Sequence, residues 1–185
     1  AGKTTLVRAM LERFDCFTFS VSATTRPPRD YEQDGVHYHF LSVARFVELK
    51  EQGQFLEWEE VYPGRYYGTL RSEVDRILNL GKYPIFDVDV KGGINIKQQY
   101  GAQALSIFIQ PPHPEVLLDR LKRRGSETEE TLRTRYDKAK EELSYADQFD
   151  RIIVNDILEE AIAELCQLMK SHGLTPTGQT PEVNL

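Results

Sequence analysis

The sequence predicts an α/β protein in which a parallel sheet is covered by helices on both faces. Short apolar segments typical of buried strands alternate with amphipathic helical segments over most of the 185 residues, and this alternation is typical of parallel sheets. A Gly-Lys-Thr sequence at residues 2–4 stands where a helix begins. Residues 23–67 contain more strand-like segments and break the alternation, which predicts a small inserted lobe of mixed strands and helix.

Short segments rich in apolar and β-branched residues are expected to form the strands. Each is bounded by polar residues, glycine or proline. They are residues 17–21, 38–41, 55–61, 85–90, 104–109 and 151–154. The polar segment 24–35 is rich in proline and arginine, which indicates a functional loop.

Amphipathic periodicity and cap residues predict the helices. Ser42 and Thr69 can each cap the helix that follows, and Asp156 with Glu159 resembles a capping box for the last helix. The helices are expected at residues 3–14, 42–53, 69–81, 114–124, 131–145 and 156–173.

The composition excludes several classes of protein. A formal net charge of −6 argues against a general nucleic-acid-binding protein. No apolar run approaches the roughly 20 residues that a membrane-spanning helix needs. Cys16 and Cys166 are far apart in the sequence and lack metal-ligand spacing, which fits reduced thiols in a cytoplasmic protein. Because the net charge of the chain is negative, a phosphate-binding site would need arginines that are concentrated locally.

The chain begins with Ala1-Gly2-Lys3-Thr4-Thr5, the second half of a G-x-x-x-x-G-K-[ST] loop. Backbone N–H groups at the start of a helix favour a phosphate, the lysine adds a mobile positive charge, and the Thr4 hydroxyl suits magnesium. The first glycine and the strand before it are absent, so we expect the natural protein to extend upstream of Ala1. Taken alone, this half-motif also fits an ordinary helix start.

A second basic motif, S-V-S-A-T-T-R-P-P-R, occupies residues 20–29. Arg26 and Arg29 lie just after a predicted strand, and guanidinium groups bind phosphate oxygens in bidentate fashion. The prolines stiffen the loop, so less entropy is lost when a ligand binds. Taken alone, a solvated basic turn also fits this motif.

With these and further motifs in order, the chain resembles the guanylate kinase family over about residues 1–173. The matching pieces are A-G-K-T-T at 1–5, S-V-S-A-T-T-R-P-P-R at 20–29, D-G-V-H-Y-H-F at 34–40, F-L-E-W at 55–58, R-Y-Y-G-T at 65–69, F-D-V-D-V-K-G at 86–92, R-R-G-S-E-T-E-E at 123–130 and I-V-N-D at 153–156. The resemblance implies a P-loop NTPase-type fold. Its expected parts are a core at 1–22, 68–113 and 146–173, a GMP-binding lobe at 23–67, a helical lid at 114–145 and a mobile tail at 174–185.

The resemblance implies that the enzyme moves the γ-phosphoryl group of ATP to GMP. The residues it assigns to the GMP phosphate are Arg26, Arg29, Tyr38 and Tyr67. The residues it assigns to guanine are Ser22, Glu57, Thr69 and Asp89. Glu57 is the most informative of these, because one carboxylate can accept both the N1–H and the N2–H₂ of guanine, whereas adenine presents an unprotonated N1 there.

The resemblance also implies a site for ATP with Mg²⁺. The residues it assigns to ATP are Ala1, Gly2, Lys3, Thr4, Thr5 and Asn155. Magnesium would be held by Thr4 and by Asp87, directly or through water. The residues expected to act on the transferred charge are Lys3, Arg26, Arg29, Arg120, Arg124 and Arg135. The expected partners are small-molecule substrates, without nucleic acid or membrane, and the sequence does not predict an oligomeric state.

Two other classes of function stay open. Guanylate kinase-like scaffold modules bind proteins without catalysis, but they typically lose the phosphate-loop lysine or parts of the GMP site, which are present here. A related kinase acting on another phosphorylated acceptor would keep Lys3 and would not need Glu57. His37 and His39 are interpreted as ordinary strand histidines and Trp58 as a core residue, and Lys91, where the family usually has glutamine, has no predicted role.

Overall fold

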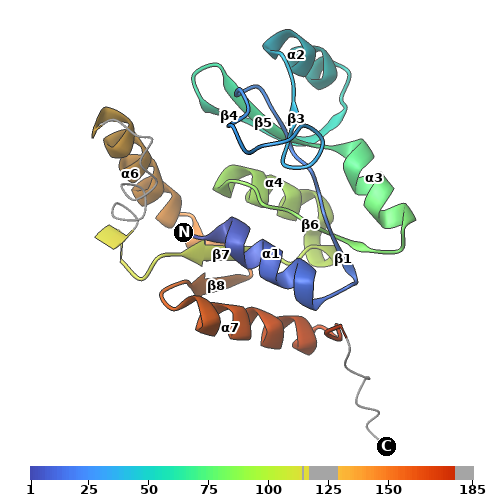
Figure 1. The fold of residues 1–185 in the computed structure, drawn as a ribbon, viewed down its shortest axis with the longest axis vertical. Coiled ribbons are helices and arrows are strands. Elements are labelled where there is room, and N and C mark those ends of the chain that lie inside the picture. Colours follow the sequence, from blue (N-terminus) through green and yellow to red (C-terminus); the bar gives the residue numbers. More distant parts are fainter. Residues whose placement is uncertain (114, 117–128, 178–185) are drawn as a thin grey trace, which may run out of the picture. The chain divides into compact units, whose positions relative to one another are not determined.

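The computed structural model describes residues 1–113, 115–116 and 129–177 (Figure 1). The chain divides into two compact units. One contains residues 1–14 and the chain from Ala102 onward, and the other contains Asp15–Gly101. Most of the helix and loop expected at residues 114–129, with Arg120 and Arg124, lies outside the described residues.

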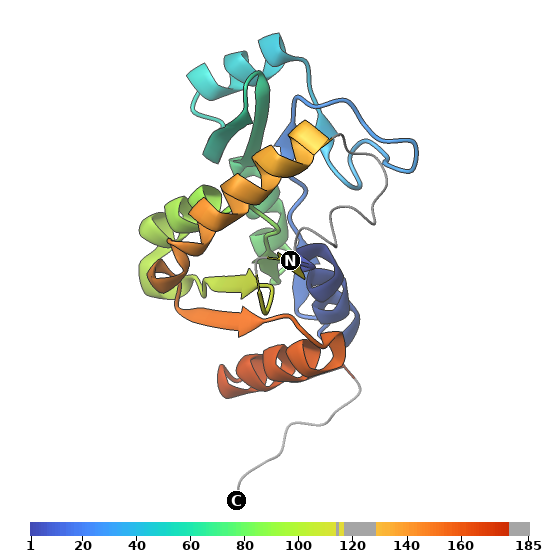
Figure 2. The same ribbon diagram turned by 90° about the vertical axis from the view of Figure 1, so that its left-hand side faces the viewer.

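The first unit combines the two ends of the chain. Strands β7 (Ile107–Gln110) and β8 (Arg151–Val154) pair in parallel, with Phe108 opposite Ile152. Helix α7 (Leu158–Ser171) lies along this pair in Figure 2 and packs against α1 (Lys3–Arg13). Their buried residues are Leu6, Ala9, Met10, Ala161, Leu165 and Met169. The unit also contains α6 (Glu129–Leu143) and the short 3-10 helix η2 (Ala146–Gln148).

The second unit contains a four-stranded mixed sheet in the order β3-β2-β5-β4. The strands are β2 (Ala23–Thr24), β3 (His39–Phe40), β4 (Phe55–Tyr62) and β5 (Arg65–Leu70). Helix α2 (Val43–Glu51) begins with Ser42, whose hydroxyl accepts a hydrogen bond from the Arg45 amide as expected. Phe46 of α2 stacks on Phe55 at a centroid distance of 4.3 Å. Phe46, Phe55 and Ala23 form a buried cluster, and Trp58 packs against it, which confirms that Trp58 is a core residue.

The same unit contains a parallel strand pair, β1 (Phe17–Phe19) with β6 (Tyr83–Ile85). Helix α3 (Arg71–Asn79) contributes buried Val74 and Ile77, and α4 (Val90–Tyr100) contributes Ile96. A cluster of Leu56, Val74 and Ile96 joins both helices to β4. The unit ends in the 3-10 helix η1 (Gly101–Gln103), which crosses into the first unit.

Three local expectations are wrong. Residues 86–89 are not strand, because β6 ends at Ile85, and Val90 begins a helix that the sequence analysis did not anticipate. Thr69 does not cap α3, because it is the fifth residue of β5 and its hydroxyl bonds across the sheet instead. The residue before α7 is Ile157, without a side-chain capping bond, so Asp156 is not the N-cap residue that a capping box requires.

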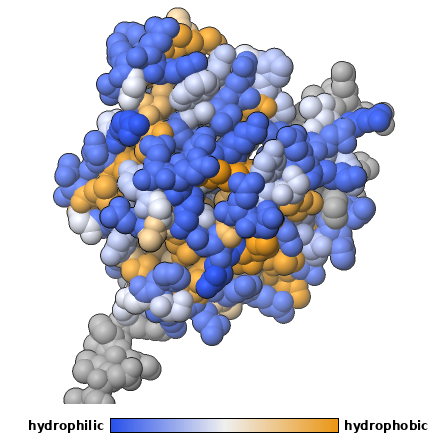
Figure 3. Space-filling view, turned by 180° about the vertical axis from the view of Figure 1, so that it is seen from behind, coloured by the Kyte–Doolittle hydropathy of each residue, from blue (hydrophilic) through white to orange (hydrophobic). Residues whose placement is uncertain are grey.

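The face of the molecule in Figure 3 is largely hydrophilic, with apolar side chains in patches between hydrophilic ones. Among the described residues, no helix is both long enough and apolar enough to cross a membrane. This agrees with the absence of long apolar runs in the sequence.

Candidate active site

The start of α1 has a geometry that only glycine accommodates. Gly2 is the N-cap residue, with φ at +84°, where other residues are strained. A Cβ added to Gly2 would lie 2.4 Å from Nδ2 of Asn155. That Nδ2 donates a hydrogen bond to the Ala1 carbonyl at 2.8 Å. Buried Asn155 therefore ties the chain just after β8 to the residues that precede Lys3.

Lys3 and Thr4 open this helix as the sequence predicts. Lys3 is the first residue of α1 and is half-buried, and Thr4 is exposed. Backbone N–H groups of a helix's first turn lack intrahelical partners, so they suit an anion. This first unit therefore carries the elements of a phosphate site: helix amides, a lysine and a hydroxyl.

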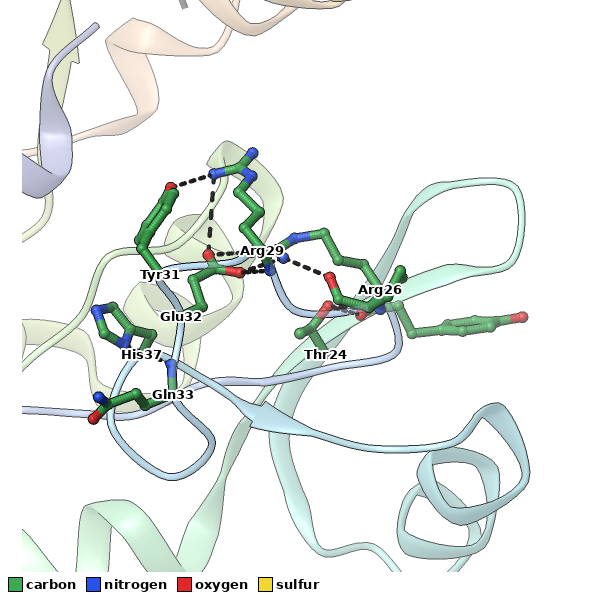
Figure 4. Close-up of polar contacts among 9 residues, drawn as sticks. Thr24, Arg26, Arg29, Tyr31, Glu32, Gln33 and His37 are labelled. Carbon is green, nitrogen blue, oxygen red and sulfur yellow. Dashed lines mark hydrogen bonds and ion pairs between the residues drawn. The ribbon is translucent and has the colours of Figure 1, made fainter. Parts of the chain in front are cut away.

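Arg26 and Arg29 lie in the loop after β2, and an unexpected residue, Glu32, lies between them (Figure 4). The Glu32 carboxylate accepts from Arg26 Nη1 at 2.6 Å and from Arg26 Nη2 at 2.7 Å. It also accepts from the Arg29 backbone amide at 2.8 Å. The hydrogen bonds from Arg26 lower the pKa of Glu32 to about 2 against the opposing effect of burial, and the same pair raises the pKa of Arg26.

Aromatic rings surround the Arg26 guanidinium. Its Cζ lies 5.0 Å from the centroid of the Tyr38 ring and 5.7 Å from that of Phe40. Tyr38 and Tyr67 contact each other edge to face at 6.0 Å. Burial, followed by the charge of Asp87, raises the pKa of the Tyr38 phenol, so it remains a neutral hydrogen-bond donor at neutral pH. The structure thus brings together Arg26, Tyr38 and Tyr67, three of the residues assigned to the phosphate of GMP.

The second group of predicted residues surrounds a buried carboxylate. Glu57 is 7% exposed, and its Oε1 accepts a hydrogen bond from the Thr69 hydroxyl at 2.6 Å. Burial raises the pKa of Glu57 to about 7. The Thr69 hydrogen bond opposes this rise and the nearby Asp89 carboxylate adds to it. A buried carboxylate whose pKa is raised by burial and by a second acid nearby suits a ligand that donates hydrogen bonds to it.

Asp89 and Gly92 complete this group at the start of α4. Asp89 is the N-cap residue, and its carboxylate accepts from the Gly92 amide at 2.9 Å. A Cβ on Gly92 would lie 2.8 Å from Oε2 of Glu57 and 3.0 Å from Oδ1 of Asp89. The sequence motif contained Gly92, but nothing in the sequence indicated this close approach, because it depends on β4 packing against α4.

The other predicted residues have these positions. Ser22 is buried just before β2, where its carbonyl accepts from the His39 amide at 2.9 Å. Asp87 is half-buried in the segment between β6 and α4. Arg29 donates to the Tyr31 hydroxyl at 3.0 Å, and its side chain is 47% exposed. Arg135 belongs to α6, and its side chain, like Arg120 and Arg124, lies outside the described part of the chain.

His37 and His39 have separate surroundings. The Gln33 amide donates to Nδ1 of His37 at 3.0 Å, and His39 lies 3.8 Å from Glu73. Within the part of the chain that the structure describes, no group of three or more histidine, cysteine or acidic residues could hold a metal ion.

A helix that begins at Gly-Lys-Thr, together with a second unit that presents arginines, tyrosines and a buried carboxylate, defines a P-loop nucleotide kinase. The chain belongs to the guanylate kinase family, since the family's sequence profile, described as guanylate kinase, matches residues 1–172. A guanylate kinase of Bacteroides thetaiotaomicron is 48% identical over 170 residues, which are 92% of this chain and 83% of that protein. One of Chlorobium chlorochromatii is 49% identical over 165 residues, 89% of this chain and 86% of that protein.

A solved structure agrees with this membership. The crystal structure of guanylate kinase from Anaplasma phagocytophilum is similar with a TM-score of 0.76 and 27% sequence identity. The match covers 95% of this chain and 86% of that one. The α/β P-loop fold expected from the sequence is thereby confirmed.

Proposed function

We propose that this chain is a guanylate kinase that transfers the γ-phosphoryl group of ATP to GMP, giving ADP and GDP. The observation that carries the proposal is the buried carboxylate of Glu57, whose Oε1 accepts a hydrogen bond from the neutral Thr69 hydroxyl. Guanine presents N1–H and N2–H₂ donors side by side, which one carboxylate accepts together. Adenine would place an acceptor against the same carboxylate, and such a buried polar mismatch discriminates strongly.

The proposed GMP-binding residues fall into two groups, one for the guanine base and one for the phosphate. Ser22, Thr69 and Asp89 complete the guanine site around Glu57. The phosphate is bound by Arg26, Arg29, Tyr38 and Tyr67. Two guanidinium groups and two phenol donors suit a dianion.

The donor residues belong to the start of α1 and its support. The backbone at residues 1–5 and the Lys3 ammonium bind the ATP phosphates, and Asn155 lies beside them. The Thr4 hydroxyl and the Asp87 carboxylate are oxygen donors of the kind Mg²⁺ prefers, so the chemistry of this pair fits the metal. When bound, Mg²⁺ neutralises charge that develops on the transferred phosphoryl group.

The chemistry needs no general base on the protein. A phosphate monoester has a second pKa near 6, so the acceptor is largely anionic at neutral pH. The protein therefore acts by positioning and by stabilising charge, with Lys3, Arg26 and Arg29 joined by Arg120, Arg124 and Arg135 of a lid at 114–145. The division into a core (1–22, 68–113, 146–173), a GMP-binding lobe (23–67), this lid and a mobile tail (174–185) is part of the same proposal.

We also place the protein in the cytoplasm. Cys16 and Cys166 are both free thiols, which fits a reducing compartment. The proposed partners are ATP and GMP alone, without nucleic acid or membrane.

A coupled assay with ATP and Mg²⁺ tests the function. The full-length protein should phosphorylate GMP far faster than AMP, CMP or UMP. Equal rates with AMP would contradict the role of Glu57. GMP binding without any turnover would favour a scaffold module, and turnover of another phosphorylated acceptor alone would favour the related-kinase alternative.

A further inference from the structure

Glu32 is the acid whose contacts the proposed reaction leaves unexplained. It lies in the loop between β2 and β3, and its side chain is only 4% exposed. Its two carboxylate oxygens accept from Nη1 and Nη2 of Arg26 at 2.6 and 2.7 Å, a bidentate pair (Figure 4). The backbone amide of Arg29 adds a third hydrogen bond at 2.8 Å. One acid thus contacts both arginines proposed to bind the phosphate.

The pair fixes the orientation of the Arg26 guanidinium. Glu32 determines the plane of the Arg26 guanidinium group, because a bidentate pair requires two parallel N–H bonds that point at the two carboxylate oxygens. Nη1 also donates to the Pro27 carbonyl at 2.8 Å, and the Tyr38 ring lies 5.0 Å from Cζ. A guanidinium held in this way loses little rotamer freedom when an anion binds to its remaining N–H groups.

Glu32 also fixes the backbone of the loop. Its amide donates to the Arg29 carbonyl at 2.9 Å, while its carboxylate accepts from the Arg29 amide. The turn from Arg29 to Glu32 is therefore closed by both its main chain and its acidic side chain. This ties the Arg29 backbone to the same carboxylate that orients Arg26.

An acid beside a phosphate site can act in two opposite ways. It can occupy the arginine until the phosphate displaces it, which would weaken binding, or it can stay paired and orient the arginine. Displacement would break both hydrogen bonds of the bidentate pair, whereas the Arg26 N–H groups that do not contact Glu32 can receive an anion while the pair stays intact. The hydrogen bonds from Arg26 lower the pKa of Glu32 to about 2, so the carboxylate stays ionised and the charged pair stays intact at neutral pH.

We propose that Glu32 is a positioning residue for the acceptor phosphate. It stays paired with Arg26 while GMP binds, and it holds the Arg26 guanidinium and the Arg29 backbone in the arrangement that receives the phosphate. The inference rests on the proposed function, because it takes GMP as the ligand of Arg26 and Arg29. It adds a residue that acts through Arg26 and does not touch the nucleotide.

Calorimetric titration of the full chain with GMP and with guanosine tests this role. Glu32→Gln keeps the shape but loses the bidentate charged pair, so the dissociation constant for GMP should rise about ten- to hundredfold. Affinity for guanosine, which lacks the phosphate, should be unchanged, and KM for ATP should also be unchanged. Glu32→Asp should recover part of the GMP affinity, because it restores the charge on a shorter side chain.

Glu48→Gln is the matched control. Glu48 pairs with Arg45 at 2.6 Å, the same distance and chemistry, but both side chains are about half exposed on α2. Glu48→Gln should leave GMP affinity at the wild-type value, because exposed ion pairs contribute little to stability.

A double-mutant cycle shows whether Glu32 acts through Arg26. In an Arg26→Lys background, which cannot form the bidentate pair, Glu32→Gln should have little further effect on GMP affinity. Tighter GMP binding by Glu32→Gln would identify a competing anion and overturn the inference. An equal loss of guanosine and GMP affinity in Glu32→Gln would also overturn the inference, since it would indicate general disruption of the lobe. Wild-type protein that fails to bind GMP would overturn the proposed function, whereas normal wild-type binding with an unaffected Glu32→Gln variant would overturn this inference alone.

Discussion

At the scale of single residues, the buried acid Glu57 couples nucleotide selection to stability. Its pKa of about 7 in the folded protein exceeds the ordinary value of 4.5. Between these two pH values the folded state binds more protons than the unfolded state, so the free energy of unfolding falls as pH rises through the window. Above pH 7 the full penalty of the buried charge applies, on the order of 3 kcal/mol.

The Glu57→Gln variant tests this coupling. Because glutamine carries no charge, the ligand-free variant should be more stable than wild type at pH 8, and the difference should shrink as pH falls to about 5. Thermal unfolding at several pH values measures this, with the exposed Glu51→Gln as control. The same variant should lose its preference for GMP over AMP. A stability difference that is constant with pH would contradict the assignment.

Gly92 gives a second prediction at this scale. Replacing a helical glycine by alanine ordinarily favours the helix by about 1 kcal/mol. Here the new Cβ would lie 2.8 Å from Oε2 of Glu57, so the carboxylate must move. We expect Gly92→Ala to retain thermal stability while kcat/KM for GMP falls about tenfold and the preference for GMP over IMP, which lacks the N2 amino group, shrinks.

The exposed neighbour Lys91 provides the control for Gly92. Lys91→Ala alters the same turn of α4 without approaching the Glu57 carboxylate. It should keep the wild-type preference for GMP over IMP. Unchanged selectivity in Gly92→Ala would mean that Glu57 does not need its present position.

At the scale of elements, β8 and α1 are joined by Asn155. Its Nδ2 donates to the Ala1 carbonyl, and its own amide donates to Gln110 of β7 at 2.8 Å. Loss of one such hydrogen bond costs about 1 kcal/mol, a several-fold change in affinity. We expect Asn155→Ala to raise KM for ATP about fivefold without changing the dissociation constant for GMP. Steady-state kinetics measures KM for ATP, and calorimetry measures the dissociation constant for GMP. Asn79→Ala, at the exposed end of α3, is the control. A matching loss of GMP affinity in Asn155→Ala would contradict the prediction.

The elements that the sequence predicts well have strong local signals. The Ser42 cap, the helical spacing of Leu6, Ala9 and Met10, and the apolar run of β8 all appear as expected. Helix α4 was missed because V-K-G-G-I-N-I has two glycines and β-branched residues in its first turns, which local propensity reads as strand or loop. Packing of Ile96 against Leu56 and Val74 supplies the stabilisation that propensity lacks.

In the candidate site, too, contacts between distant parts of the chain could not be predicted from the sequence. Family motifs singled out Arg26, Glu57 and Thr69 as candidate site residues. They could not reveal that Thr69 donates to Glu57 or that Glu32 pairs with Arg26, because these contacts join strands or loop positions that only the folded chain brings together.

At the scale of the whole molecule, the proposed donor and acceptor residues fall largely in different compact units. Lys3 and Asn155 belong to the unit that contains residues 1–14 and the chain from Ala102, whereas Arg26 and Glu57 belong to Asp15–Gly101. Each unit has its own buried residues and its own hydrogen bonds around its part of the site. Binding of either nucleotide alone should therefore depend mainly on the unit that carries its residues, while turnover depends on both.

Lys3→Ala tests this separation. Removing a charge aimed at the developing negative charge of the transferred phosphoryl group should lower kcat by about a hundredfold or more. The dissociation constant for GMP should stay at the wild-type value, because the residues proposed to bind GMP lie in the other unit. Lys170→Ala removes the same charge from the exposed last turn of α7 in the unit of Lys3, and it should change neither quantity. Coupled assays give kcat and calorimetric titration gives the dissociation constant. A loss of GMP affinity in Lys3→Ala comparable to its loss of turnover would mean that the two half-sites are wrongly assigned, because Lys3 is proposed to bind the donor nucleotide and Arg26 and Glu57 the acceptor.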